Sequence, residues 1–140
     1  MGTGVVTAIL LDTNALLWLV STPDKIVTSA QQTLADPANE LIVSAASAWE
    51  VAIKTRIGRL DGGPLLSAWD ETLAAINASA LPIESADAIM AGQLNWAHKD
   101  PFDRVIVAQA ARRSLTIATS DGQIATGALT AVMKIRKGQR

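Results

Sequence analysis

The 140-residue chain contains no cysteine and only one histidine, His98. The absence of cysteine excludes a disulfide framework and a thiolate zinc site, and it fits a protein of the reducing cytoplasm. A single histidine excludes a His-rich metal centre, so we expect oxygen ligands for any bound metal. The chain also lacks a long apolar run. The longest early run, residues 5–11, is too short to span a bilayer, and no basic segment typical of a signal peptide precedes it.

The net charge is only −1, from 12 basic and 13 acidic residues, so the chain lacks the basic excess of a dedicated nucleic-acid-binding domain. The basic residues are nevertheless unevenly placed. One group follows Glu50 and another crowds the C-terminus: Lys54, Arg56 and Arg59, then Lys134, Arg136, Lys137 and Arg140. A local patch of this kind can bind a phosphate backbone. A solvated helix end and a solubilising tail explain the same residues equally well.

Hydrophobic residues make up 49% of the chain, which predicts one compact domain over residues 1–140 with a substantial core. Short apolar runs predict strands at residues 5–11, 41–44, 80–83, 115–119 and 129–135. Helical periodicity and capping residues predict helices at residues 15–20, 28–35, 46–57, 65–77, 85–96 (with Ser85 as its cap) and 101–113. Strands that alternate with helices predict an α/β fold with a mostly parallel sheet covered on both faces.

Four acidic residues stand at or within apolar segments: Asp12, Glu50, Asp103 and Asp121. Asp12 and Asp121 follow predicted strands, where ligands bind in parallel α/β sheets. Each also has an ordinary explanation, because aspartate after a strand is a common helix cap or turn residue. Glu50 falls on the apolar stripe of its predicted helix, and Asp103 shares a helix face with Ile106. A snorkelling position explains Glu50, and a place near the positive helix end explains Asp103.

Taken together, the four carboxylates would lie near one edge of the sheet. Buried carboxylates are costly unless they are paired, protonated or bound to a metal. One or two Mg²⁺ or Mn²⁺ ions would turn their mutual repulsion into binding. Carboxylate-bound metal ions of this kind position a water for attack on phosphorus and stabilise the leaving oxygen. The four acids therefore indicate a divalent-metal site for phosphoester chemistry.

Four segments resemble PIN domains, and in particular VapC-type toxins of toxin–antitoxin pairs: residues 11–18 (LDTNALLW), 44–54 (SAASAWEVAIK), 98–104 (HKDPFDR) and 118–121 (ATSD). The resemblance covers nearly the whole chain in the family's order and spacing. It implies a three-layer α/β/α sandwich and an endoribonuclease that uses Mg²⁺ or Mn²⁺ to leave a 5′-phosphate. It also implies an antitoxin partner that blocks the acidic pocket, and a homodimer. The positions that match the family's metal site are Asp12, Glu50, Asp103 and Asp121.

One position departs from the family pattern, because many relatives have a basic residue where this chain has Ser120. Asn14 is expected to hold a metal-bound water, to orient a carboxylate, or to make a helix-start hydrogen bond. Arg104 is expected to steady the acids, to reach a phosphate or to form a surface ion pair. Asp100 is expected to cap the helix that follows it. For His98 we expect a structural or exposed role, because a metal ion can activate water without a histidine base.

Other classes fit less well. A haloacid-dehalogenase-like phosphatase needs a second aspartate at the position of Asn14, and a receiver-type signalling module needs an acidic pair and a lysine that are not visible. A dinucleotide site is weaker still, because Gly2 and Gly4 precede the first strand instead of following it. The tryptophans are expected in the core or on a dimer surface, not as base-stacking platforms: Trp18, Trp49, Trp69 and Trp96.

Overall fold

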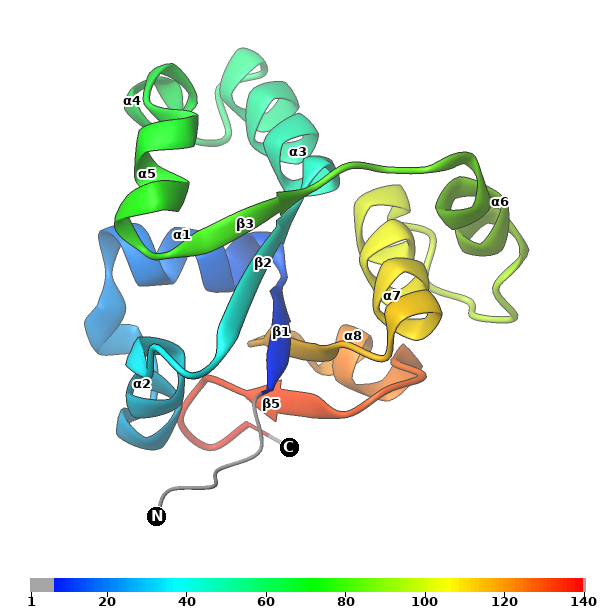
Figure 1. Cartoon of the computed structure of the whole chain (residues 1–140). Helices are drawn as coiled ribbons and strands as arrows, with labels where there is room; N and C mark the ends of the chain where they lie inside the picture. Colours follow the sequence, from blue (N-terminus) through cyan, green and yellow to red (C-terminus); the bar gives the residue numbers. More distant parts are fainter. Residues whose placement is uncertain (1–6, 140) are drawn as a thin grey trace.

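The computed structural model describes residues 7–139 and contains a five-stranded sheet in the order β3-β2-β1-β4-β5 (Figure 1). All four strand pairings are parallel. The strands are β1 (Ala8–Leu11), β2 (Glu40–Ser44), β3 (Ala78–Leu81), β4 (Thr116–Thr119) and β5 (Val132–Lys134). The helices are α1 (Thr13–Ser21), the 3₁₀ helix η1 (Pro23–Lys25), α2 (Thr28–Ala35), α3 (Ala45–Arg56), α4 (Gly63–Ser67), α5 (Trp69–Ala75), α6 (Ser85–Gln93), α7 (Pro101–Arg113) and α8 (Gly122–Gly127).

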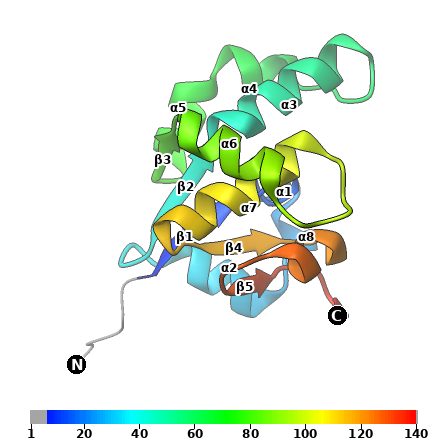
Figure 2. The same cartoon turned by 90° about the vertical axis from the view of Figure 1, so that its right-hand side faces the viewer.

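The sheet separates two apolar cores, which confirms the predicted α/β/α sandwich. Successive residues of β1 point to opposite faces. Ile9 and Leu11 pack with α1, α2 and α5, whereas Leu10 packs with α7 and α8, and all three are fully buried. Figures 1 and 2 show α6 and α7 on one side of the sheet and α1, α2 and α5 on the other. Because β1 is buried on both faces, it reads as a continuous hydrophobic run and not as an alternating one.

The strand order places Asp12 and Asp121 at the switch point of the sheet, where β2 and β3 lie on one side of β1 and β4 and β5 on the other. β1 has β2 on one side and β4 on the other. In open parallel sheets, ligands bind at the carboxyl ends of such strands. Asp12 directly follows β1, and its N–H donates to the carbonyl of Ala118 in β4 at 3.0 Å. Asp121 lies just beyond the end of β4, so both aspartates leave the same edge of the sheet.

Two predicted elements differ from the structure in the middle of the chain. The helix predicted over residues 65–77 is two helices, α4 and α5, which meet at Ala68 in a non-helical conformation (φ −118°, ψ 32°). The strand predicted at residues 80–83 lies at Ala78–Leu81. Pro82 follows it directly, and a proline has no N–H to donate to a strand ladder, which explains why β3 ends there.

The surroundings of α6 also correct the sequence analysis. Its N-cap is Glu84 and not Ser85, and the Asp87 carboxylate accepts a hydrogen bond from the Glu84 N–H at 2.9 Å. The helix ends at Gln93, before the predicted end at residue 96. The short helix α8 was not predicted, because its glycine-containing sequence has a low helical propensity. Asp121 caps it by accepting a hydrogen bond from the Gln123 N–H at 2.8 Å.

Among residues 7–139, no helix is both long and apolar enough to cross a membrane. Of the strand predicted at residues 5–11, the first two residues lie outside the described part of the chain. The strand predicted at residues 129–135 is confirmed as β5, although only three residues pair.

Three tryptophans pack against the two cores as predicted: Trp18, Trp69 and Trp96. The fourth, Trp49, is 54% exposed and meets the ring of Phe102 edge-on.

Candidate active site

A cleft of about 570 Å³ opens at the carboxyl ends of β1 and β4, and all four predicted acids line it: Asp12, Glu50, Asp103 and Asp121. Several of the predicted supporting residues line it as well: Asn14, Lys54, Arg59, Asp100 and Ser120. Two predicted residues do not line it, namely Arg56, which is exposed on α3, and Arg104. The structure therefore brings together side chains from five segments that are far apart in sequence.

Asp12 is both a helix cap and part of the cleft. Its Oδ1 accepts a hydrogen bond from the Ala15 N–H at 2.7 Å, and the residue is only 2% exposed. Burial raises the pKa of this carboxyl to about 7, against hydrogen bonds from Thr119 and Ala15 that favour the charged form. The nearby charges of Asp103 and Asp121 raise the pKa further. At pH 7 Asp12 would therefore be protonated in about half of the molecules, and a bound cation would favour its charged form.

Glu50 is buried in α3, at 4% exposure, in agreement with its predicted core-facing position. Ile57, the last residue of the predicted helix, is instead 49% exposed and lies just after the end of α3 at Arg56. The Glu50 Oε2 pairs with the Lys54 Nζ one turn later on the helix. The other oxygen, Oε1, is buried and has no hydrogen-bond partner. An unpartnered buried carboxylate oxygen costs several kcal/mol unless a cation or a proton satisfies it, so this atom fits a metal ligand.

Asp103 lies in the first turn of α7, after the N-cap Asp100. The Asp100 Oδ1 accepts hydrogen bonds from the N–H groups of Phe102 at 2.9 Å and Asp103 at 3.1 Å, which confirms its predicted capping role. The Asp103 Oδ2 accepts a hydrogen bond from the His98 Nε2 at 2.7 Å. Burial raises the pKa of Asp103 to about 6, and the charges of Asp100 and Glu50 add to this, whereas His98 opposes it.

His98 was expected to be structural or exposed, yet its side chain is 16% exposed and bonds directly to a predicted metal ligand. The hydrogen bond to Asp103 raises the pKa of His98 above its usual value, although burial opposes this. Within residues 7–139, His98, Asp100 and Asp103 form the one group of three possible ligands whose atoms lie within 4.8 Å of one another. The prediction of oxygen ligands for a bound metal stays a prediction, and the structure adds that a ring nitrogen lies close to Asp100 and Asp103. The placement of His98 two residues before the Asp100 cap was the signal in the sequence.

The four predicted acids surround the cleft more widely than that group of three does. Wider spacing is compatible with Mg²⁺, which keeps several waters and takes only one or two carboxylates directly. The carboxylate-rich lining, the unpartnered Glu50 Oε1 and the raised pKa of Asp12 all favour a hard divalent cation at this position. The residues present therefore fit Mg²⁺ or Mn²⁺.

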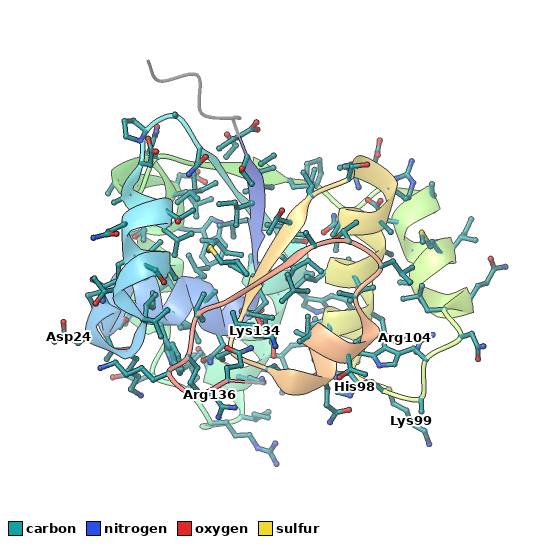
Figure 3. All side chains as sticks on the ribbon, turned by 90° about the horizontal axis from the view of Figure 1, so that it is seen from below. Asp24, His98, Lys99, Arg104, Lys134 and Arg136 are labelled. Carbon is teal, nitrogen blue, oxygen red and sulfur yellow. The ribbon has the colours of Figure 1, made fainter. Side chains whose placement is uncertain are left out.

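Arg104 has a different role from those predicted, because its guanidinium binds backbone carbonyls. It donates to the carbonyl oxygens of four residues, at 2.7–2.9 Å: Ala91, Leu94, Trp96 and His98. Figure 3 shows Arg104 beside His98, next to the chain that leads to Lys99. Among the described residues Arg104 forms no ion pair with a carboxylate. It instead fixes the loop between α6 and α7, and with it the backbone of His98.

Asn14 and Ser120 join α1 to the end of β4. The Asn14 Nδ2 donates to the Ser120 Oγ at 2.6 Å, a contact between two residues that line the cleft and not the helix-start bond considered for Asn14. Ser120 is only 7% exposed. Arg136 also lines the cleft, although the sequence analysis placed it only in the basic C-terminal group. The pairing of β5 with β4, which brings Arg136 to this edge, could not be read from the sequence.

A protein-family model described as the PIN domain matches residues 9–128. A search of curated proteins found no match. Among solved structures, FitAcB from Neisseria gonorrhoeae is 26% identical, with a TM-score of 0.58 over 90% of this chain and 96% of that chain. VapBC2 from Rickettsia felis, bound to a DNA fragment from its promoter, is 13% identical, with a TM-score of 0.68 over 92% and 99%.

DNA-bound VapBC from Salmonella typhimurium is 15% identical, with a TM-score of 0.67 over 92% of this chain and 98% of that chain. At identities this low, the two VapBC similarities show the fold. The family model spans most of the residues that build the sheet and the cleft, from β1 to the end of α8. The chain therefore belongs to the PIN-domain family.

Proposed function

We propose that this single PIN domain is a metal-dependent endoribonuclease and the toxin of a toxin–antitoxin pair. The observation that carries the proposal is the buried Glu50 Oε1, which has no partner in a cleft lined by four further acids. Such an atom favours a bound cation over a purely structural role. The family membership supports nuclease chemistry, and several structural neighbours are named as VapBC or FitAB systems, which supports the toxin role.

The proposed cofactor is Mg²⁺ or Mn²⁺, held by Asp12, Glu50, Asp103 and Asp121 in part through water. When bound, it would supply Lewis-acid activation of water and neutralise charge on the scissile phosphate. The chain's own residues orient the reaction. Asp12 and Asp121 are fixed as caps of α1 and α8, and Asp103 is held by His98. Rigid helix ends of this kind keep the carboxylates in place for catalysis.

The reaction we propose is hydrolysis of an RNA phosphodiester. A water oxygen adds to phosphorus, the bond from phosphorus to the 3′ oxygen breaks, and that oxygen leaves as a 3′-hydroxyl. The proton lost by the water balances the proton taken by the 3′ oxygen, and the other product carries a 5′-phosphate. His98 and Asp103, joined by a 2.7 Å hydrogen bond, are placed to hold a proton beside the cleft.

We also propose a cytoplasmic protein that forms a homodimer and binds a cognate antitoxin. The named complexes of the structural neighbours support an antitoxin partner. An acidic cleft would accept a basic side chain from such a partner.

The decisive experiment incubates the purified protein with labelled RNA in Mg²⁺, in Mn²⁺ and in EDTA. We expect cleavage only with metal, and products whose 5′ ends accept label from a kinase only after phosphatase treatment. Glu50→Gln should lose cleavage, whereas the matched control Glu40→Gln should keep it, because Glu40 is exposed at the opposite end of β2. Cleavage that persists in EDTA, or equal loss in both variants, would contradict the proposal.

A further inference from the structure

We infer that Arg136, together with Arg59 and Lys54, forms a phosphate-binding rim that holds the RNA backbone beside the acidic cleft. This inference rests on the proposed function, because it names how that same site recognises its substrate. The three cations come from separate segments: Lys54 from α3, Arg59 from the loop after it, and Arg136 from the segment after β5. All three line the cleft together with the acids.

The backbone around Arg136 is held firmly against the sheet. β5 pairs with β4 so that Lys134 lies opposite Thr119, and the Ile135 N–H donates to the Thr119 carbonyl at 3.1 Å. The Ile135 carbonyl in turn accepts a hydrogen bond from the Val27 N–H at 2.8 Å. Arg136 therefore leaves the sheet at the same edge as Asp121, with its side chain exposed (Figure 3).

The charges of the two arginines are available for a ligand. Lys54 pairs with Glu50, but within residues 7–139 neither Arg59 nor Arg136 forms an ion pair. Arginine presents a planar set of donors that matches phosphate oxygens. An acidic cleft alone would repel a polyanion, and a metal ion would offset that repulsion only at its centre. Cations at the rim supply attraction for the phosphates on either side of the scissile one.

Position 120 strengthens the case for Arg136. Ser120, just after β4, is buried and bonded to Asn14. It therefore offers no charge to a substrate. Arg136 supplies a cation at the same edge of the sheet, from the strand next to β4. Of the three basic residues that follow Glu50 in the sequence, only Lys54 and Arg59 line the cleft, so Arg56 is not part of the rim.

The test measures binding of a short fluorescein-labelled single-stranded RNA by anisotropy, in EDTA and in Ca²⁺, across a range of salt concentrations. Arg136→Gln and Arg59→Gln should each weaken binding several-fold and reduce the slope of log affinity against log salt by about 0.7, the value for one lost phosphate contact on a single strand. The matched controls Lys137→Gln and Arg56→Gln are exposed neighbours that do not line the cleft, so they should change neither quantity. Arg136→Lys should recover part of the salt slope.

The outcomes separate this inference from the proposed function. The inferred phosphate-binding rim would be wrong if Arg136→Gln left the RNA affinity and its salt slope unchanged. It would also be wrong if Lys137→Gln reduced both quantities as much as Arg136→Gln does. A wild-type protein that does not bind RNA under either condition would overturn it as well. If the wild-type protein binds RNA with the predicted salt slope but cleaves none with any metal, the phosphate-binding rim is supported and the proposed nuclease activity is wrong. Circular dichroism of each variant confirms that the fold is kept.

Discussion

The His98 Nε2 donates a hydrogen bond to the Asp103 Oδ2 at 2.7 Å and thereby joins the loop before α7 to a carboxylate of the cleft. The loop is itself fixed by Arg104, which binds the backbone carbonyl of His98 at 2.9 Å. The proton state of the only histidine is therefore coupled to the charge of Asp103. The hydrogen bond and the nearby charge of Asp103 together raise the pKa of His98.

The first prediction concerns the titration of His98 by NMR. Because the chain has one histidine, its ring signals need no assignment. We expect a pKa above the usual 6.5 in the metal-free protein. Asp103→Asn should lower it, since an amide keeps a hydrogen-bond acceptor but removes the negative charge. Asp24→Asn, an exposed control in η1, should leave it unchanged. An equal pKa in wild type and Asp103→Asn would contradict the coupling.

The second prediction is that the metal-free protein becomes less stable as pH rises from about 4 to about 7. Asp12 and Asp103 have raised pKa values in the folded state, so the folded protein binds more protons than the unfolded chain over this range. His98 acts in the same direction above pH 6.5. For Asp12, a change from 3.8 to about 7 corresponds to roughly 4 kcal/mol at most, at about 1.4 kcal/mol per pKa unit.

Urea unfolding in EDTA at about pH 5 and about pH 8 measures this difference. Asp103→Asn should be more stable than wild type at the higher pH, because it removes a repulsive charge from the cleft. The prediction would be contradicted by a lower urea midpoint for Asp103→Asn than for wild type in EDTA. It would also be contradicted by a wild type that is more stable at pH 8 than at pH 5, because the charged carboxylates would then not destabilise the fold.

The third prediction concerns metal binding without any activity readout. Mg²⁺ or Mn²⁺ should raise the midpoint of thermal unfolding, because an ion that binds only the folded state stabilises it. The rise should be larger at about pH 8 than at about pH 5, since the cation must displace protons from Asp12 and Asp103. Glu50→Gln should reduce the rise, and Glu40→Gln should not. A metal response that is independent of pH would argue against binding at these acids.

The fourth prediction is that Arg104→Met destabilises the protein by roughly 2–3 kcal/mol, because several charge-assisted hydrogen bonds to backbone carbonyls are lost. The loop between α6 and α7 should lose protection from amide exchange. Arg56→Met, at an exposed site on α3, should change stability by less than about 0.5 kcal/mol. If Arg104→Met abolished cleavage with full stability and unchanged exchange, Arg104 would act on substrate instead.

Sequence patterns were sufficient for β1, β2 and β4, because these central strands are mostly buried and stand out as apolar runs. The edge strand β3 is largely exposed, so its position was predicted two residues too late. The carboxylates at strand ends could also be placed, since the topology of a parallel sheet brings those ends together. Arg104 was misread because its partners are backbone carbonyls, which leave no trace in the identity of the side chains. Arg136 was missed as a cleft residue because its position depends on which strand β5 joins. Short elements such as α8 depend on tertiary packing more than on propensity.

The fifth prediction concerns Asp87, which was not singled out by any sequence pattern. Its carboxylate is fully buried in α6 and pairs with Arg112 at 2.5 Å and Arg113 at 2.8 Å, both from α7. Burial would raise the pKa of Asp87, but hydrogen bonds from Arg113, the Glu84 N–H and Arg112 together hold it well below its usual range. Asp87→Ala should cost roughly 3–5 kcal/mol, because it removes one partner of a buried ion pair.

Glu84 is the matched control, because it pairs with the same two arginines but its side chain is 61% exposed. Glu84→Ala should therefore cost no more than about 1 kcal/mol. A depressed folded-state pKa means that the stability contributed by Asp87 is present above its unfolded pKa near 4 and is lost as pH falls below it. Acid unfolding should accordingly begin below pH 4 in wild type, and this step should be missing in Asp87→Ala. Equal losses for the two variants would mean that burial contributes nothing to the strength of the α6–α7 ion pair.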